Sequence, residues 1–493
     1  MREGQPWAKD PDEDLLQEAC GVVGVMAAAQ ELPVAQLTYS ALAGLQHRGE
    51  GAAGIVIGEE NFGGFRFVGI KDTGMVADVF SDRAATIDKM ASSAILGVGH
   101  VRWPTSAQAG DPFHAAQPFL KGELVVAQNG HIEEMGRIAE QYGIKNYVSD
   151  GDALTQTLEF LSRPEHAGST LDAMHDLFPR LDGGYSLVIA EPNRIHGIRD
   201  PWGTRPLWLG RFATGAFMIA SEQPVLHEAG KVTDEREIAP GEIVSIDRHG
   251  NTESSLINRE AKGGLCALEG VYFARPDGIL DGRSVYQSRM EMGRLLAREH
   301  PADADVVIGV PDSGTIAAMG YAEESAIPYA IGLFRNPYTT RTFIQSSPEV
   351  RRRMVLEKLR PNRQVIEGRR LVVVDDSIVR GTSSDALTEV LRSAGATEVH
   401  YRISSAPFVN PCYSGTAISN PHTLFARKYP THQERVAKLG ADSLGYLSTE
   451  GVAQAQGKRI GSLCMACMDG SYPFEVPLPV SERRILPVQP TNR

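Results

Sequence analysis

The chain has 493 residues, of which 42% are hydrophobic and 22% charged, an ordinary composition for a globular protein with more than one domain. Its formal net charge is −12, and because nucleic-acid binding usually needs a basic face we expect no nucleic-acid partner. No apolar run reaches the length of a membrane span, and residues 1–19 are acidic and lack the apolar core of a secretory signal. Five scattered cysteines do not make a disulfide framework, so we expect a cytoplasmic location.

The first half of the chain alternates short β-rich segments with a few helical ones. Strands are expected near residues 95–98, 124–127, 187–190 and 217–220, and helices near 35–45 and 153–161. Cys20 begins an apolar segment, CGVVGV, and on its own would be interpreted as a small core residue. The pattern predicts an α+β domain built on packed antiparallel sheets.

In the second half, the apolar runs 306–310 and 371–374 predict buried parallel strands, each followed by a polar loop and a helix. Asp375 and Asp376 follow the second run directly, and the loop 377–384 contains Gly381 before a helix expected from about residue 386. A loop between a parallel strand and a helix N-terminus suits a ligand with a phosphate and sugar hydroxyls. The same pattern also fits a strand–helix turn with solvated acids.

The string DDSIVRGTSS at 375–384 resembles the PRPP-binding loop of type I phosphoribosyltransferases. The resemblance implies that the acids hold the ribose hydroxyls and the loop holds the 5-phosphate. The implied PRPP-binding residues are Asp375, Asp376, Ser377, Arg380, Gly381, Thr382 and Ser383.

The motif PDSGT at 311–315 suits the pyrophosphate and its Mg²⁺, which is usually held partly by substrate phosphates. The implied magnesium ligands are Ser313, Asp375 and Asp376. Residues 333–353 resemble the loop that closes over PRPP in this family, with Pro337 in place of a usual Arg.

The motifs LQHRG at 45–49, GHVR at 99–102, QNG at 128–130 and LDGGYSL at 181–187 follow Cys20 in the order found in N-terminal-nucleophile (Ntn) glutamine amidotransferases. They most closely resemble the glutaminase domain of the amidophosphoribosyltransferase family. In that family an N-terminal thiol attacks the glutamine amide, with its own α-amino group as the base. The resemblance therefore implies that Cys20 is the nucleophile and that residues 1–19 are a removable propeptide rather than only an acidic tail.

The resemblance also assigns roles around the bound glutamine. Arg102 would bind its α-carboxylate and Asp150 its α-ammonium, while Asn129 and the Gly130 N–H would form the oxyanion hole. The chain departs from the family pattern beside these residues, at Trp103, Pro104, Gln128, His131 and Asp152.

The four remaining cysteines are Cys266, Cys412, Cys464 and Cys467, and the last two form a C-x-x-C motif. Such a motif alone could be redox-active, zinc-binding or inert. Its surroundings resemble an amidophosphoribosyltransferase subgroup that carries a propeptide and holds a [4Fe–4S] cluster on four thiolates. Zinc on the same thiolates is the alternative.

Together these resemblances imply an α+β Ntn hydrolase glutaminase domain followed by an α/β type I phosphoribosyltransferase domain. The expected boundaries are a propeptide at 1–19, the glutaminase domain at 20–262, the phosphoribosyltransferase domain at 263–473 and a tail at 474–493.

The implied activity converts PRPP, glutamine and water to 5-phosphoribosylamine, glutamate and pyrophosphate, the first step of purine synthesis. A homo-oligomer, a tetramer in the family, and feedback by purine nucleotides are implied as well. The alternatives are a paralogue that serves a specialised pathway and an inactive PRPP-binding regulator.

Overall fold

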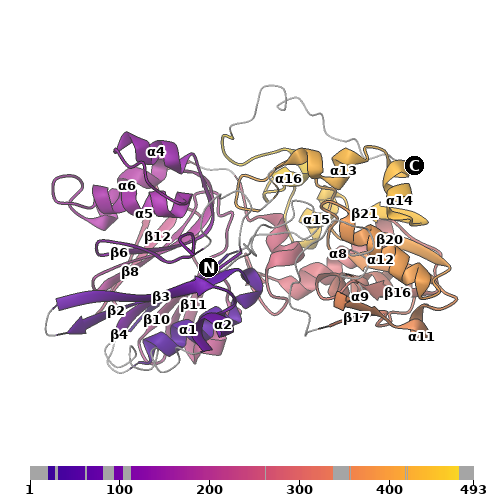
Figure 1. Ribbon diagram of the computed structural model, residues 1–493, viewed down its shortest axis with the longest axis horizontal. Coiled ribbons are helices and arrows are strands. Elements are labelled where there is room, and N and C mark those ends of the chain that lie inside the picture. The colour runs from indigo at the N-terminus through magenta and orange to yellow at the C-terminus, as the bar shows by residue number, and fades with distance from the viewer. Residues whose placement is uncertain are drawn as a thin grey trace, which may run out of the picture.

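The computed structural model describes residues 20–27, 32–61, 64–81, 94–103, 113–260, 263–336, 355, 357–416, 418 and 420–476. The expected propeptide lies outside the described residues, as do Pro104, Pro337 and the rest of the expected closing loop up to residue 353. The two halves of the chain form two bodies that meet along one side (Figure 1). In the part of the chain that is described, no helix is long and apolar enough to span a membrane.

Two antiparallel sheets form the first half. The first has the order β11-β9-β10-β1-β4-β2-β3, with β1 at Gly21–Met26, β2 at Ala52–Asn61, β3 at Gly64–Thr73, β4 at Ala94–Arg102, β9 at Trp208–Phe212, β10 at Phe217–Ala220 and β11 at Val232–Glu237. The second has the order β13-β12-β8-β7-β6-β5, with β5 at Phe119–Lys121, β6 at Leu124–Glu133, β7 at Asp182–Glu191, β8 at Arg194–Arg199, β12 at Glu242–Asp247 and β13 at Thr252–Leu256. The four strands expected from the sequence lie within β4, β6, β7 and β10.

The two sheets pack face to face. Val22 and Met26 of β1 share one apolar core with Val125 of β6 and Val188 of β7. A Cβ on Gly24 would lie 2.5 Å from the Ile195 side chain of the facing sheet, so the sheets are in direct contact there. All six residues of β1 are buried because both faces of the strand are covered.

Helices cover the outer faces of both sheets, so the first half has four layers (Figure 1). The first sheet carries α1 at Val34–Gly44, α2 at Val76–Phe80 and α7 at Pro224–Ala229. The second carries α4 at Met135–Gln141, α5 at Asp150–Leu161 and α6 at Thr170–Leu177. The predicted antiparallel α+β architecture is confirmed.

The second half is built on a parallel sheet with the order β16-β19-β20-β21. These strands span Val306–Gly309, Arg370–Asp375, Glu398–Ile403 and Ser443–Tyr446. Val372 and Val374 of β19 face a core shared with α8 (Val285–Glu299), α9 (Ser313–Ser325) and α15 (Thr449–Ala455). Leu371 and Val373 face the opposite core, with α12 (Thr382–Ser393) and α14 (His432–Leu439). The expected α/β class is confirmed.

The remaining elements are short. They are the strand pairs β14 (Ile279–Leu280) with β15 (Arg283–Ser284) and β17 (Leu333–Arg335) with β18 (Leu359–Pro361), and the helices α11 (Arg363–Ile366), α13 (Phe425–Lys428) and α16 (Ala466–Asp469). Single helical turns lie at η1 (Gln46–Arg48), η3 (Phe178–Arg180), η4 (Glu269–Phe273) and η5 (Pro421–Thr423).

Helix α12 begins earlier than the sequence suggested. It starts at Thr382, so residues 382–384 form its first turn instead of the end of the loop. Gly381, with a φ of 81°, lets the chain turn from the loop directly into the helix. The apolar periodicity could not reveal this turn because its side chains are polar.

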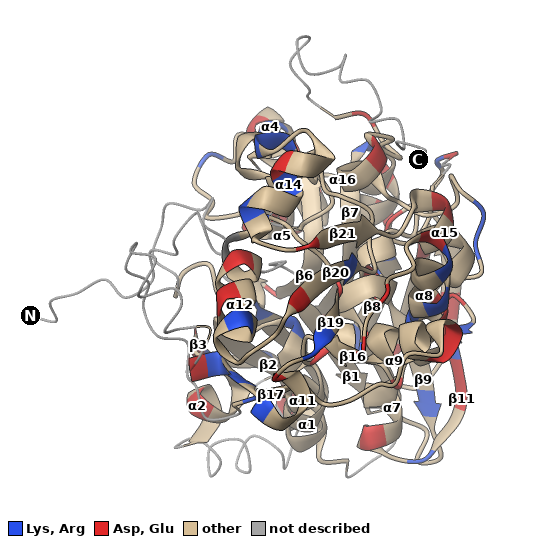
Figure 2. Ribbon diagram, turned by 90° about the vertical axis from the view of Figure 1, so that its right-hand side faces the viewer, with Lys and Arg blue, Asp and Glu red and all other residues tan. Residues whose placement is uncertain are grey.

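Charges of both signs lie along the helices of the second half, such as α8 and α12, on the face shown in Figure 2. They are interspersed, which is typical of a solvated surface.

Candidate active sites and family membership

Cys20 stands at the entrance of β1, the central strand of the first sheet. The Arg48 guanidinium donates a hydrogen bond from Nε to the Cys20 carbonyl oxygen, with an N···O distance of 3.2 Å. The Val22 N–H donates to the Ser221 hydroxyl at 2.9 Å, which fixes the strand two residues farther on. The expected nucleophile is therefore held by a buried side chain at the end of a rigid strand.

Arg102 ends β4, which pairs with β1. Val101 lies opposite Gly21 in the antiparallel register, so the register places Arg102 at the position opposite Cys20. Its side chain is buried. The register thus brings the expected carboxylate ligand beside the expected nucleophile.

The expected oxyanion residues lie on β6 of the facing sheet. Asn129 is fully buried, and among the described residues neither atom of its side-chain amide has a hydrogen-bond partner. A buried amide without partners is costly unless a ligand satisfies it. Gly130 has a φ of 106°, and a Cβ there would lie 2.0 Å from the Gly184 carbonyl oxygen, so no larger residue fits. Both features suit the oxyanion hole expected at these two residues.

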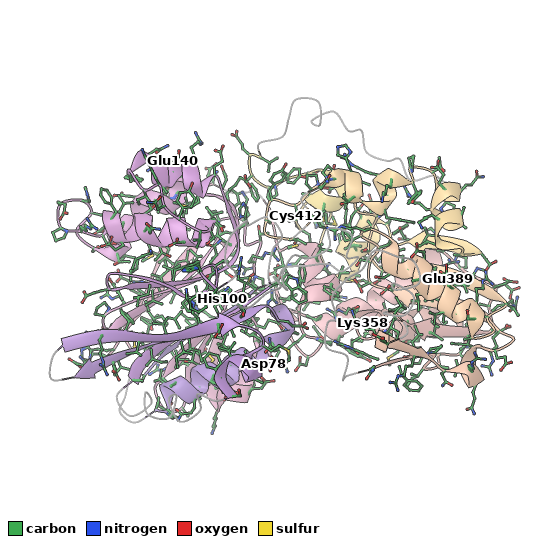
Figure 3. The ribbon with its side chains drawn as sticks, in the orientation of Figure 1. Asp78, His100, Glu140, Lys358, Glu389 and Cys412 are labelled. Carbon is green, nitrogen blue, oxygen red and sulfur yellow. The ribbon has the colours of Figure 1, made fainter. Side chains whose placement is uncertain are left out.

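His100 ties the two sheets together at this point (labelled in Figure 3). Burial lowers its pKa to about 3, so the ring is neutral, and its Nε2 donates to the Gln128 carbonyl oxygen at 2.9 Å. This bond links β4, which carries Arg102, to β6, which carries Asn129.

Asp150 begins α5 and has three protein donors around it. Its Oδ2 accepts from Gln128 Nε2 at 2.6 Å and from the Ile132 N–H at 2.9 Å, and it lies 3.1 Å from His131 Nδ1. Gln128 and His131 are two of the departures from the family pattern, so both changes converge on the carboxylate expected to bind the glutamine ammonium.

His131 and Asp150 form an ion pair. Partial burial opposes the charge of the ring, but the Asp150 and Glu133 carboxylates outweigh it and raise the His131 pKa well above its usual value. Burial likewise opposes ionisation of Asp150, but His131 and the hydrogen bonds lower its pKa. Below this raised pKa the charged His131 would compete with the ligand ammonium expected at Asp150.

We expect the KM for glutamine to fall as pH rises through the raised pKa of His131, because the neutral ring no longer competes for the carboxylate. In a His131→Asn variant the KM should be low already and lose this pH dependence. The effect should be about two- to fivefold, as for an ion pair partly open to solvent. Glutaminase kinetics across pH check it, with the exposed His166→Asn as control. An unchanged pH dependence of KM in His131→Asn would refute the competition.

At the other site, the carboxyl ends of β16 and β19 meet. A Cβ on Gly314 would lie 2.5 Å from the Val374 carbonyl oxygen, so α9 begins directly against the end of β19. Asp376 is buried and accepts hydrogen bonds from the Ser313 and Ser377 hydroxyls. Burial raises the Asp376 pKa, although both hydroxyls favour the carboxylate. Ser313 and Asp376, predicted from separate motifs, are thus in contact.

The loop after Asp376 wraps onto the start of α12. Gly381 packs against the Phe425 ring, and a Cβ there would lie 2.3 Å from a ring carbon. The first N–H groups of α12 lack intrahelical partners and, with the helix dipole, favour an anion at this end. The Thr382 side chain lies outside the described residues, while Arg380 and Ser383 lie where the loop enters the helix.

One cavity of about 380 Å³ connects the two halves. From the first half it is lined by His47, Arg48, Glu50 and Trp103. From the second half it is lined by the expected PRPP residues Asp375, Asp376, Ser377 and Ser383, and also by Ser313, Tyr272, Arg275, Arg289, Arg335 and Lys358. It is large enough for a small-molecule ligand.

Sequence patterns had not pointed to Arg289. Arg289 lies on α8 and donates to the carbonyl oxygens of Gly270, Tyr272 and Ala274 at 2.8–3.0 Å, so it holds the η4 segment against the cavity. A lone Arg in an amphipathic helix carries no recognisable motif, so its place became visible only in the fold.

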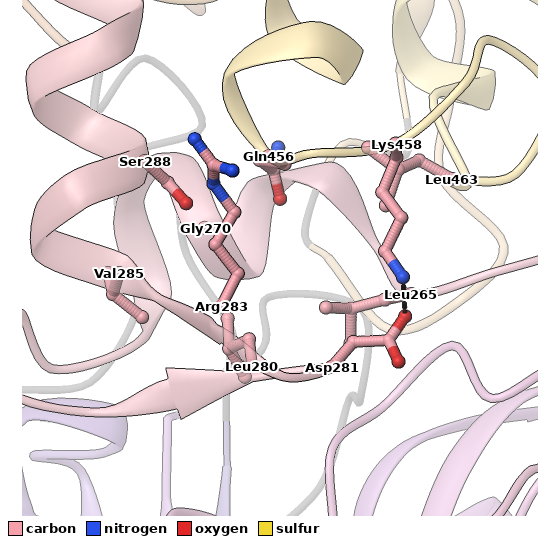
Figure 4. A pocket seen from close by; sticks show the side chains of 10 residues that line it. All are labelled: Leu265, Gly270, Leu280, Asp281, Arg283, Val285, Ser288, Gln456, Lys458 and Leu463. Carbon is pink, nitrogen blue, oxygen red and sulfur yellow. Dashed lines mark ion pairs between the residues drawn. The ribbon is translucent and has the colours of Figure 1, made fainter.

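A second cavity, near β15 and α15, is much smaller (Figure 4). Its volume is about 10 Å³, room for little more than one water molecule. The Lys458–Asp281 ion pair lies along its edge. It is too small to be a substrate site.

The four remaining cysteines lie close together: Cys266 and Cys467 belong to the core shared with α8 and α9, and Cys412 packs against it (Cys412 is labelled in Figure 3). Cys266 and Cys464 pair in a parallel β-bridge, and the Val409 and Asn410 N–H groups donate to the Cys467 carbonyl oxygen. Burial raises the pKa of Cys266 to about 12 and also raises the pKa values of Cys464 and Cys467, with the neighbouring Cys412 adding to each.

Comparison with known proteins agrees with this geometry. A family model described as a glutamine amidotransferase domain matches residues 105–228. The amidophosphoribosyltransferase of Mycobacterium tuberculosis is 39% identical over 490 residues, covering 95% of this chain and 89% of the relative. The chain belongs to the amidophosphoribosyltransferase family. The family member of Synechocystis sp. is 38% identical over 497 residues, covering 99% of this chain and 97% of the relative.

A solved structure extends the similarity to three dimensions. The glutamine phosphoribosylpyrophosphate (PRPP) amidotransferase from B. subtilis, complexed with ADP and GMP, has a TM-score of 0.81 and 35% identity. The match covers 92% of this chain and 98% of that one. The expected Ntn glutaminase and type I phosphoribosyltransferase folds, and the class of enzyme, are confirmed.

Proposed function

We propose that this amidophosphoribosyltransferase hydrolyses glutamine at Cys20 and uses the ammonia to displace pyrophosphate from PRPP, giving 5-phosphoribosylamine at the start of purine synthesis. The observation that carries this proposal is that one cavity is lined both by Arg48 of the first half and by Asp375 and Asp376 of the second. The direct test is steady-state release of pyrophosphate that requires both glutamine and PRPP.

In the glutaminase half, the Cys20 thiol would attack the amide carbon, and its α-amino group, freed by removal of residues 1–19, would accept the thiol proton. Arg102 would hold the α-carboxylate of glutamine and Asp150 its ammonium. The unpartnered amide of Asn129, with the Gly130 N–H, would stabilise the oxyanion. The presence of this set argues against an inactive PRPP-binding regulator.

In the second half, Asp375 and Asp376 would accept hydrogen bonds from the ribose hydroxyls, and residues 377–383 would receive the 5-phosphate at the start of α12. Ser313 and the two carboxylates supply the oxygen ligands that Mg²⁺ prefers, and the pyrophosphate would supply the others. Such an ion would supply positive charge next to the leaving pyrophosphate. Catalysis here is mainly positioning and charge stabilisation at C1.

We propose that ammonia passes between the two centres through the cavity that both halves line. Phe273, Val310 and Leu359 add apolar surface to that cavity. Trp103, which replaces a usual Tyr, stands on its glutaminase side. An enclosed route would keep ammonia from being protonated in bulk water, and we propose that the cavity serves this purpose.

We further propose that Cys266, Cys412, Cys464 and Cys467 hold a [4Fe–4S] cluster. Three buried thiols with the partly buried Cys412 beside them suit a metal group, because unpaired thiolates would be strongly disfavoured there. Zinc would need four sulfurs within about 2.3 Å of one ion. Among the described residues no three His, Cys, Asp or Glu side chains are arranged as a metal site, so the proposal rests on the four cysteines and on the resemblance of their surroundings to the cluster-carrying subgroup.

Protein purified without oxygen is expected to be brown and to contain about four iron and four sulfide per chain. Cys464→Ser should lose iron and lower Tm, because the ligands join three separate segments of the chain. Cys20→Ser is the matched control, since it removes a thiol outside this group and should keep its iron. One zinc per chain without sulfide would refute the cluster and support the alternative.

The ADP and GMP in the B. subtilis structure support a proposal that purine nucleotides also bind this chain as feedback ligands. A homo-oligomer, a cytoplasmic location and the domain boundaries given above remain predictions, as does the alternative of a paralogue that makes phosphoribosylamine for a specialised pathway.

A further inference from the structure

A buried network of four charged side chains crosses the boundary between the two halves. Its members, Arg48, Glu222, Arg205 and Glu269, have side chains at most 2% exposed. Arg48 Nη2 donates to both carboxylate oxygens of Glu269 at 2.8 Å, and its Nη1 donates to Glu222. Arg205 Nη1 donates to Glu269 at 3.1 Å. Glu269 therefore bridges two arginines that come from different parts of the glutaminase domain.

One end of this network is the nucleophile. Arg48 is the residue whose Nε donates to the Cys20 carbonyl oxygen at 3.2 Å. Because all of its other side-chain bonds go to Glu222 and Glu269, these two carboxylates fix the position of the guanidinium. The place of Cys20 thus depends on Glu269 through one intervening side chain.

The other end is the group of four cysteines. The Glu269 N–H donates to the Cys266 carbonyl oxygen at 3.0 Å. Arg205 donates from Nε and Nη2 to the Ser414 carbonyl oxygen, at 3.0 and 2.7 Å, and Ser414 lies two residues after Cys412. Two segments that carry cysteines are therefore bonded to the network.

The Cys412 segment also contacts the oxyanion strand directly. A Cβ on Gly415 would lie 2.7 Å from the Gly130 Cα, so the two backbones touch. The segment thus meets the glutaminase centre at two independent places, at Gly130 by packing and at Cys20 through Arg205, Glu269 and Arg48.

We propose that Glu269 is a positioning residue that couples the arrangement of the four cysteines to the position of the nucleophile Cys20. Disturbing the cysteine group should then slow the glutaminase half-reaction. The PRPP centre, which lies on β16, β19 and α12, should keep its activity with ammonia. The inference rests on the proposed role of Cys20. It gives the cysteine group a function in catalytic competence in addition to holding the fold together.

The test compares Glu269→Gln with Glu237→Gln. Glu237 also pairs with a buried arginine, Arg199, at 3.1 Å, but within the described part of the chain it forms no hydrogen bond or ion pair with Arg48 or the cysteines. Each variant is measured for ammonia-dependent pyrophosphate release, glutamine kcat and KM, Tm, iron content, and covalent labelling of Cys20 by the glutamine analogue 6-diazo-5-oxo-L-norleucine, read by mass spectrometry.

In Glu269→Gln we expect labelling and glutamine kcat to fall on the order of 10²-fold, the cost typical of a small misplacement of a reacting group. The KM for glutamine, the ammonia-dependent rate and the iron content should stay within about twofold, and Glu269→Asp, which keeps the charge, should recover part of the labelling. Glu237→Gln should match the wild type. Cys412→Ser should slow labelling as Glu269→Gln does.

Two results would overturn the inference. One is labelling of Cys20 at the wild-type rate in Glu269→Gln. The other is a parallel fall in the rates of both half-reactions and in Tm, which would make Glu269 merely structural. If Glu269→Gln does not fold, Arg205→Lys, which loses the paired bonds to Ser414, is measured in the same way and decides. No labelling of Cys20 in the wild-type enzyme would instead refute the proposed nucleophile.

Discussion

Cys20→Ser is expected to lose glutamine-dependent pyrophosphate release by on the order of 10³-fold or more, as when other nucleophiles are removed. The hydroxyl is a much weaker nucleophile than the thiol, but it fits the same space at the entrance of β1, so the fold should persist. Activity with ammonium salt, at a pH that supplies free NH₃, should remain near the wild-type value because the PRPP centre lies on other strands. Kinetics with each nitrogen donor check the prediction.

Processing of the N-terminus gives this prediction a second form. Protein that retains residues 1–19 should behave like Cys20→Ser, because an amide nitrogen at Cys20 cannot act as a base. The active enzyme should begin Cys-Gly-Val-Val. Full glutamine-dependent activity from protein that begins at Met1 would contradict the N-terminal-nucleophile mechanism. Loss of both activities in the serine variant would contradict the separation of the two centres.

Changing Asp375 and Asp376 together to Asn is expected to weaken PRPP binding on the order of 10²-fold or more, since hydrogen bonds to charged groups contribute about 1.5–3 kcal/mol each. The amides keep the shape of the carboxylates but lose the negative charge. That charge strengthens the hydrogen bonds from the ribose hydroxyls and helps to hold Mg²⁺. Calorimetric titration of PRPP with Mg²⁺ checks it.

Asp305→Asn is the matched control. Asp305 pairs with Arg370 at the opposite end of β19, at 2.8 Å, and its carboxylate does not line the cavity. It should keep wild-type PRPP affinity. Unchanged affinity in the double variant would refute the assignment of the two acids.

The parts of this structure that the sequence predicts well have local periodic signals. The four apolar residues 371–374 and the acids after them predicted β19 and its carboxyl end because a strand buried on both faces is continuously apolar. The order of short motifs around Cys20, Arg102 and Asn129 likewise predicted the glutaminase fold through family resemblance.

What the sequence left out depends on contacts between distant segments. Arg48, Arg205 and Glu269 come from three places in the chain, and nothing in their neighbours shows that they share one buried network. Gln128 and His131 looked like separate departures from the family, and only the fold shows that both contact Asp150. Trp103 was another isolated departure, and only the fold shows that it lines the cavity between the two halves.

The most direct test of the two-centre account follows nitrogen from glutamine to product. Enzyme supplied with PRPP, Mg²⁺ and amide-¹⁵N glutamine, in a buffer containing excess unlabelled ammonium near neutral pH, should release glutamate and pyrophosphate in equal amounts. Its phosphoribosylamine should carry the label of the glutamine amide if ammonia crosses the cavity between the two halves, as we propose. A product whose ¹⁵N fraction equals that of the ammonium pool in solution would contradict transfer through the cavity. Absence of glutamine-dependent pyrophosphate release would contradict the proposed function.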